Sequence, residues 1–216
     1  FQLKLIPSFY CDYFSDETAY LLFLIQAKLW RRDCVSVIDL KKPFVFSKER
    51  KQCIRRGIKN NLIIKEDLNF ELFWNTILIP NLQKKHGVMP VHSLDEIIKL
   101  RQLFPKNIRH FNVYHQDKIV AGTTIFITDK VAHPQYISGN DQKNKLGSLD
   151  YLYHYLITEV FQSLDFFDFG ISNEENGKKL NEGLLFWKES FGGKTIVQDY
   201  YEIETEKVAL LDDLLI

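Results

Sequence analysis

The sequence predicts an α/β (α+β) fold in which a mixed, mostly antiparallel sheet is flanked by helices. Strand-like runs at residues 108–115, 118–128 and 130–138 follow one another through tight turns at Gln116-Asp117 and Asp129-Lys130. That arrangement predicts an antiparallel meander. Segments with helical spacing of apolar residues precede and follow it, at residues 68–86, 93–103 and 148–164. A chain of 216 residues that is 45% hydrophobic can bury a sizeable core.

The first sixty residues predict an incomplete α/β unit. Residues 34–40 and 44–46 are expected to be strands, separated by Lys41-Lys42-Pro43. The predicted domains are therefore a partial N-terminal unit, residues 1–60, packed on a main domain, residues 61–216. A basic segment at residues 48–57 predicts a short helix with Ile54 and Ile58 inward. Its cations form either a solvated face or a basic rim that receives an anion.

The main domain has a clear order of elements. A strand at residues 62–66 precedes a helix at residues 68–86, which Pro80 interrupts or kinks. Phe70, Phe73, Trp74, Ile77 and Leu78 form the apolar side of that helix. The helix at residues 93–103 has a capping-box pattern that begins at Ser93. After the helix at residues 148–164 come a strand at 166–172, a polar turn, a helix ended by Gly192-Gly193, and a strand at 194–203.

Three features stand out in the C-terminal part. They are Asp168-Phe169-Gly170, Asn181 eleven residues before Gly192, and residues 186–193, which read Phe-Trp-Lys-Glu-Ser-Phe-Gly-Gly. With them, the C-terminal part resembles the FemAB-like branch of the GNAT acyltransferase superfamily. The predicted order β-α-α-β-β-β-α-β-α-β also matches the GNAT order, from about residue 62 to the C-terminus. The resemblance implies a GNAT-like fold and an enzyme that moves an acyl group from acyl-CoA, acetyl-CoA above all, to an amine or hydroxyl.

The resemblance implies a donor site at the loop before the helix at residues 148–164. In GNAT enzymes free amides at this helix N-terminus bind the pyrophosphate of acyl-CoA. Gln142 and Gly147 fit the family pattern, whereas Lys145 replaces its middle glycine and either blocks the backbone approach or binds phosphate itself. FemAB-like proteins commonly lack a strict loop, and some use aminoacyl-tRNA. The expected donor-binding residues are Ile137, Ser138, Gln142, Lys143, Lys145, Leu146, Gly147, Ser148 and Asn181.

Proton transfer in this chemistry needs a base and an acid. His133 lies on the strand expected to contact the donor and has a suitable intrinsic pKa, but it is equally an edge-strand surface residue. Pro134 cannot donate to a strand ladder, so we expect a distortion there. Tyr136 is the candidate acid, and Glu174 a second candidate base. Asp168, Ser172 and Glu175 are the expected acceptor-binding residues.

Composition limits the partners. Lys+Arg and Asp+Glu both total 28, so bulk charge favours neither tRNA nor an anionic membrane. Three separated cysteines fit a reducing compartment, with the cytoplasm as the default, and neither a metal site nor a membrane span is expected. Two alternatives to a small-molecule acyltransferase of the cell envelope stay open: an aminoacyl-tRNA-dependent peptidyl transferase, and a GNAT-like module that binds without catalysis. The acceptor and the oligomeric state are left undetermined by the sequence.

Overall fold

The computed structural model describes residues 1–13 and 15–212. The chain divides into two compact units. Unit 1 comprises Phe1–Val37, Phe169–Glu189 and Gly193–Ile216, and unit 2 comprises Ile38–Asp168 and Ser190–Gly192. Both units are discontinuous in sequence, whereas the division predicted at residues 60/61 is contiguous and stays a prediction.

Unit 2 is built on a mixed sheet. Its strands are β3 (Ile63–Glu66), β4 (Ile108–His115), β5 (Lys118–Ile127), β6 (Val131–Gly139) and the first half of β7 (Phe166–Ile171). They are ordered β7-β6-β5-β4-β3, with β6 and β7 parallel and the other pairs antiparallel. The meander and the fold class are confirmed. Residues 44–46, however, form no strand, so that prediction is wrong.

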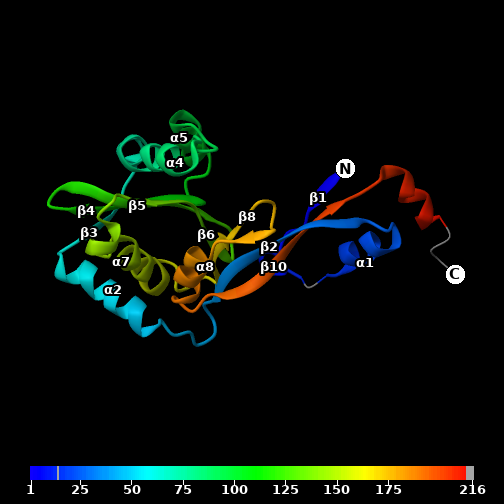
Figure 1. Ribbon diagram of the computed structural model, residues 1–216, viewed down its shortest axis with the longest axis horizontal. Helices are drawn as coiled ribbons and strands as arrows, with labels where there is room; N and C mark the ends of the chain where they lie inside the picture. Colours follow the sequence, from blue (N-terminus) through cyan, green and yellow to red (C-terminus); the bar gives the residue numbers. More distant parts are fainter. Residues whose placement is uncertain (14, 213–216) are drawn as a thin grey trace. The chain divides into compact units, whose positions relative to one another are not determined.

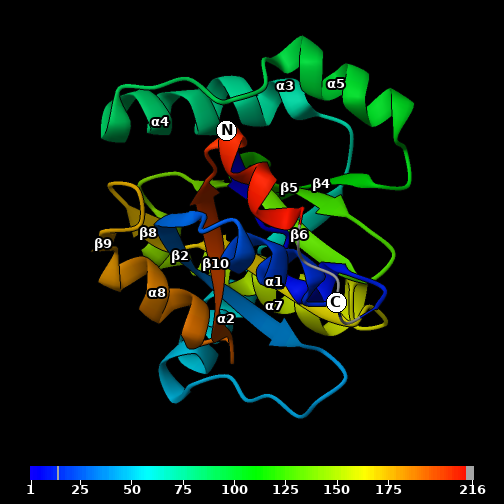
Figure 2. The same ribbon diagram turned by 90° about the vertical axis from the view of Figure 1, so that its right-hand side faces the viewer.

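Helices cover both faces of this sheet. α3 (Phe70–Phe73), the π-helical turn η2 (Trp74–Leu78), α4 (Ile79–His86) and α5 (Leu94–Leu103) lie on one face (Figures 1 and 2). α2 (Lys48–Lys59) and α7 (Ser148–Tyr155), which η3 (Leu156–Val160) extends, lie on the other. The short helix α6 (Lys143–Leu146) precedes α7.

The predicted local signals around α3 to α5 are confirmed. Pro80 stands at the start of α4, directly after the π turn, where its missing N–H is tolerated. All five predicted apolar side chains are buried and join one core cluster that comprises Phe70, Phe73, Trp74, Ile77, Leu78, Ile97, Ile108 and Tyr136. Ser93 and Glu96 form the predicted capping box at α5.

Unit 1 contains an antiparallel sheet of β1 (Gln2–Lys4), β10 (Lys194–Glu202) and β2 (Lys28–Asp39) up to Val37, in the order β1-β10-β2. It also contains η1 (Ser8–Tyr10), α1 (Glu17–Leu24), η4 (Thr205–Leu211) and the hairpin β8 (Asn173–Glu174) with β9 (Lys179–Leu180). α8 (Glu182–Glu189) packs through Trp187 onto Phe169 of β7, with ring centroids 5.7 Å apart. Within the described residues, no helix has the length and apolar character that crossing a membrane requires.

Candidate functional site

His133 and Asp168 come together where the parallel ladder of unit 2 ends. β6 and β7 pair at Val131↔Phe166 and Ala132↔Phe167, and His133 and Asp168 are the next residues along each strand. The His133 Nδ1 atom lies 3.2 Å from Asp168 Oδ2 and 3.2 Å from the Asp168 carbonyl oxygen. The Asp168 side chain is 5% exposed and that of His133 is 29% exposed. A buried carboxylate thus orients a histidine that solvent still reaches.

This geometry sets the tautomer of the neutral imidazole ring. Both neighbours of Nδ1 are oxygen acceptors, so Nδ1 carries the proton and donates it. In the neutral ring, Nε2 then has a free lone pair and can accept a proton. The arrangement fits a general base held in one orientation by a carboxylate, which is the chemistry expected of His133.

A β-bulge follows His133. The pairing of β6 with β5 shifts between Tyr136↔Thr124 and Pro134↔Ile125, which leaves Gln135 unpaired. The distortion predicted from Pro134 is therefore confirmed, because proline cannot donate to the ladder. The extra residue also brings His133 and Tyr136 to the same face of the sheet, since their partners Phe126 and Thr124 are two residues apart.

The Tyr136 hydroxyl group is held by His92. The His92 backbone N–H donates to Tyr136 Oη at 3.0 Å, and His92 Nδ1 lies 2.6 Å from the same oxygen. The indole of Trp74 packs edge-on against the tyrosine ring at 4.9 Å and donates to the His92 carbonyl. Burial raises the pKa of Tyr136, so its hydroxyl stays protonated. Only the folded chain reveals His92, because it lies in a loop with no local motif.

The end of β6 is fixed by Asn81, a residue that no sequence pattern singled out. Its side-chain amide donates to Ser138 Oγ at 2.7 Å and to the Gly139 carbonyl at 2.8 Å. Ser138 is buried, and Ile137, the other expected donor contact on this strand, is half-buried. The segment is therefore held in a defined position beside the loop that follows.

The expected donor loop has an exposed beginning and a buried end. Gln142 and Lys145 are exposed and Lys143 is half-buried, whereas Leu146, Gly147 and Ser148 are buried. Burial lowers the pKa of Lys143, and the positive charge of the nearby Lys85 lowers it further. The Ser148 hydroxyl is one of the buried polar groups in the described chain that have no hydrogen-bond partner.

Gly147 is needed for helix packing. Its φ is +70°, and a Cβ built there would lie 2.3 Å from the Cys53 carbonyl oxygen and 3.2 Å from the Gly57 nitrogen, both in α2. In the next turn Asp150 places a buried carboxylate, paired with Arg50 of α2, near the start of α7. This carboxylate already complements the positive end of the helix dipole. The glycine is thus explained without a bound phosphate.

Four expected site residues belong to unit 1. The Asn181 side chain caps α8 by accepting from the Leu184 N–H at 3.0 Å, and donates to Glu174 Oε1 at 2.9 Å. Glu175 forms an exposed ion pair with Lys179 at 3.1 Å. Ser172 is buried, and its hydroxyl is without a hydrogen-bond partner among the described residues. Their roles in binding stay predictions.

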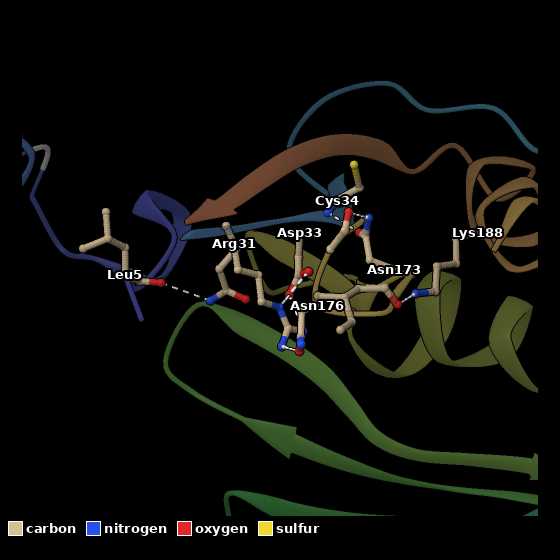
Figure 3. Close-up of polar contacts among 10 residues, drawn as sticks. Leu5, Arg31, Asp33, Cys34, Asn173, Asn176 and Lys188 are labelled. Atoms are coloured by element: carbon tan, nitrogen blue, oxygen red, sulfur yellow. Dashed lines mark hydrogen bonds and ion pairs between the residues drawn. The ribbon is translucent and has the colours of Figure 1, made fainter. Parts of the chain in front are cut away.

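Unit 1 also holds buried charges that no sequence motif indicated. Lys188 of α8 is 2% exposed, and its ammonium donates to the carbonyl oxygens of Gly170 and Ile171 at 2.9 and 2.5 Å. Asp33 of β2 is fully buried, and its Oδ2 atom forms an ion pair with Arg31 Nη2 at 2.8 Å (Figure 3). The neighbouring Cys34 N–H donates to Asn173 Oδ1.

The fold is a mixed, mostly antiparallel sheet flanked by helices, and several solved structures share it. FemX matches with a TM-score of 0.67 and 9% identity over 91% of this chain and 70% of that one. The C-terminal domain of a putative lysylphosphatidylglycerol synthetase from Agrobacterium fabrum matches with a TM-score of 0.59 and 14% identity, over 90% of this chain and 69% of that one. L-PGS from Bacillus licheniformis matches with a TM-score of 0.54 and 12% identity, over 90% of this chain and 68% of that one. No protein-family model and no curated protein sequence matches this chain. At these identities the likeness is one of fold.

Proposed function

We propose that this chain is a group-transfer enzyme in which an amine or hydroxyl of an acceptor attacks an activated acyl carbonyl directly. The observation that carries the proposal is the His133–Asp168 pair, held at 3.2 Å where the β6–β7 ladder ends. His133 Nε2 takes the proton of the attacking group as the new bond to the carbonyl carbon forms. The bond to the leaving group then breaks, and that group departs with the electron pair and is protonated.

The favoured donor is an aminoacyl ester carried by tRNA. The close packing of Gly147 on α2 accounts for the glycine, and the buried carboxylate of Asp150 already lies in the first turn of α7. This loop therefore gives weak support for a pyrophosphate site. One of the similar structures belongs to a putative lysylphosphatidylglycerol synthetase, a name that implies transfer of a lysyl group, and another is FemX. The resemblance to FemAB-like proteins, some of which use aminoacyl-tRNA, agrees with this donor.

A second candidate is an acyl-CoA-dependent N-acyltransferase. The exposed start of the loop favours it, because Gln142 and the ammonium groups of Lys143 and Lys145 could receive phosphates without the backbone of Gly147. In either case we propose a small acceptor, such as an amino sugar or another cell-envelope precursor.

The donor is identified by following a radiolabel from each candidate donor into the product. tRNA charged with radiolabelled amino acids, or labelled acetyl-CoA, is incubated with the protein and a bacterial small-molecule and lipid extract. Transfer from the charged tRNA into an acid-soluble or solvent-extractable product is expected. Transfer from acetyl-CoA alone would favour the second candidate. Consumption of neither donor would refute the enzymatic proposal and leave a binding module.

A further inference from the structure

One face of α2 is a row of cations. The helix holds six basic residues and a single acidic one, Glu49. Its buried residues are Arg50, Ile54 and Gly57. Lys48, Lys51, Arg55 and Lys59 recur at intervals of three, four and four residues, which places them together on the opposite face. We call these four residues the α2 stripe.

The α2 stripe is exposed and carries uncompensated charge. All four side chains are exposed, and among the described residues none forms an ion pair with a carboxylate. The chain as a whole has a net charge of zero, so this concentration is local. Like charges along one helix face repel one another, and a bound anion would relieve that repulsion.

Further cations flank the stripe. Arg56 of α2 donates to the Asn144 carbonyl of α6 at 3.2 Å, which joins the two helices. α6 carries Lys143 and the exposed Lys145. Burial and the neighbouring charge of Lys85 lower the pKa of Lys143, so cations from α4 and α6 stand close together here.

α2 is held firmly in unit 2. Ser47 caps its start by accepting the Arg50 N–H at 3.1 Å. The Arg50 guanidinium is buried, pairs with Asp150 and donates to Ser190 Oγ at 2.8 Å. Gly57 allows the helix to approach Tyr151 closely. The α2 stripe is therefore presented by a rigid element, with about 16 Å between its end residues at 1.5 Å per residue.

The chemistry of this face fits a polynucleotide better than a lipid surface. A helix that lies in a membrane interface buries an aromatic or aliphatic face. The one large apolar side chain of α2 that is exposed is Ile58, and the opposite face is packed on α7. Phosphodiesters repeat along a nucleic-acid strand and match a linear row of lysine and arginine.

We propose that the α2 stripe binds the sugar-phosphate backbone of the tRNA that carries the donor aminoacyl group. The inference rests on the proposed function, whose donor it deepens. Since phosphate contacts position a nucleic acid without reading its bases, the stripe binds tRNA with little sequence preference.

The test compares two triple variants of the full chain. One removes part of the stripe, K51Q/R55Q/K59Q. The matched control, K99Q/K106Q/K118Q, removes three exposed lysines from α5 and the segments that follow it in the same unit. Binding of labelled uncharged tRNA is measured by filter retention between 50 and 200 mM salt, and thermal midpoints establish that both variants fold.

We expect the stripe variant to bind tRNA at least tenfold more weakly than the natural chain. The slope of log affinity against log salt should become shallower by about two to three, roughly one for each phosphate that the variant no longer neutralises. The control should change affinity less than threefold. Equal weakening by both variants, no tRNA binding at 50 mM salt, or stripe-dependent binding to anionic lipid vesicles in place of tRNA would overturn the proposal.

Transfer assays separate this inference from the proposed function. Stripe-dependent tRNA binding without aminoacyl transfer from any charged tRNA would support the surface and count against the enzyme. Aminoacyl transfer that is equally fast in the stripe variant, at tRNA concentrations below saturation, would keep the enzyme and reject the surface.

Discussion

Gly57 of α2 lies directly against Tyr151 of α7. A Cβ built at Gly57 would be 2.4 Å from Tyr151 Cβ, closer than side-chain carbons ever approach. The two helices can therefore pack at their observed separation only while residue 57 is glycine.

We expect Gly57→Ala to destabilise the protein by about 1–3 kcal/mol, because the added methyl overpacks a close helix contact. Urea unfolding measures the change. Gly183→Ala in α8 is the matched control, since its Cβ would meet nothing nearer than Asn181 Oδ1 at 3.9 Å. The control should be neutral or slightly stabilising through helix propensity. Equal destabilisation of both variants would contradict the packing argument.

The buried His110 should make stability fall in mild acid. Burial lowers its pKa from 6.5 to about 4. The unfolded chain binds a proton below pH 6.5 while the folded chain stays neutral, so stability is lost as pH falls from 6.5 and the loss levels off below about 4. The full effect is about 3 kcal/mol.

Urea titrations at pH 7.0, 5.5 and 4.5 measure this loss. His110→Gln should weaken the dependence between pH 6.5 and 4.5. It removes the titrating ring, although it also perturbs the hydrogen bonds to Thr124 and Asn112. An unchanged slope in the variant would assign the acid sensitivity to other groups.

The Arg50–Asp150 pair is buried and joins α2 to α7. Asp150→Ala should cost about 3–5 kcal/mol, because the guanidinium loses its buried counter-charge. The double variant Arg50→Met, Asp150→Leu should recover much of that loss, since no charge is then left buried. Thermal unfolding of the three proteins tests this order. A double variant that is no more stable than Asp150→Ala would show that the packing or the hydrogen bond to Ser190 matters more than the charge.

Asp168→Asn should lower the transfer rate by about a hundredfold or more while leaving donor binding nearly unchanged. An amide can present its NH₂ group to Nδ1, which favours the wrong tautomer and removes the free lone pair from Nε2. His133→Gln should cause a loss of similar size, and the two changes should not add. Additive losses in the double variant would mean that the two residues act separately.

Local patterns predicted the elements well. Apolar spacing correctly identified the buried side of α3 and η2, the Ser93 capping box was confirmed, and Pro134 correctly marked a distortion of β6. Each signal acts within a few residues through backbone hydrogen bonding or side-chain periodicity. The expectation that Ile58 faces inward was wrong: it is 56% exposed. Gly57 takes the buried position because only a residue without a side chain fits against Tyr151.

The candidate site depends more on contacts that are distant in sequence. The sequence singled out His133 as a candidate base and, separately, Asp168 as an acceptor-binding residue. The fold decided that the two side chains touch, although they lie 35 residues apart in the chain. His92 and Asn81 carry no local signal at all, because their partners are Tyr136 and Ser138 on β6.

The sequence by itself determined the order of helices and strands and the fold class, because hydrophobic periodicity, caps and turns act locally. Tertiary structure decided which polar residues lie next to one another. It places the Asp168 carboxylate against His133 Nδ1, packs the backbone of α2 against Gly147, and directs the α2 stripe away from the core. The physical reason is that these outcomes depend on register and close packing between separate elements, which no local pattern encodes.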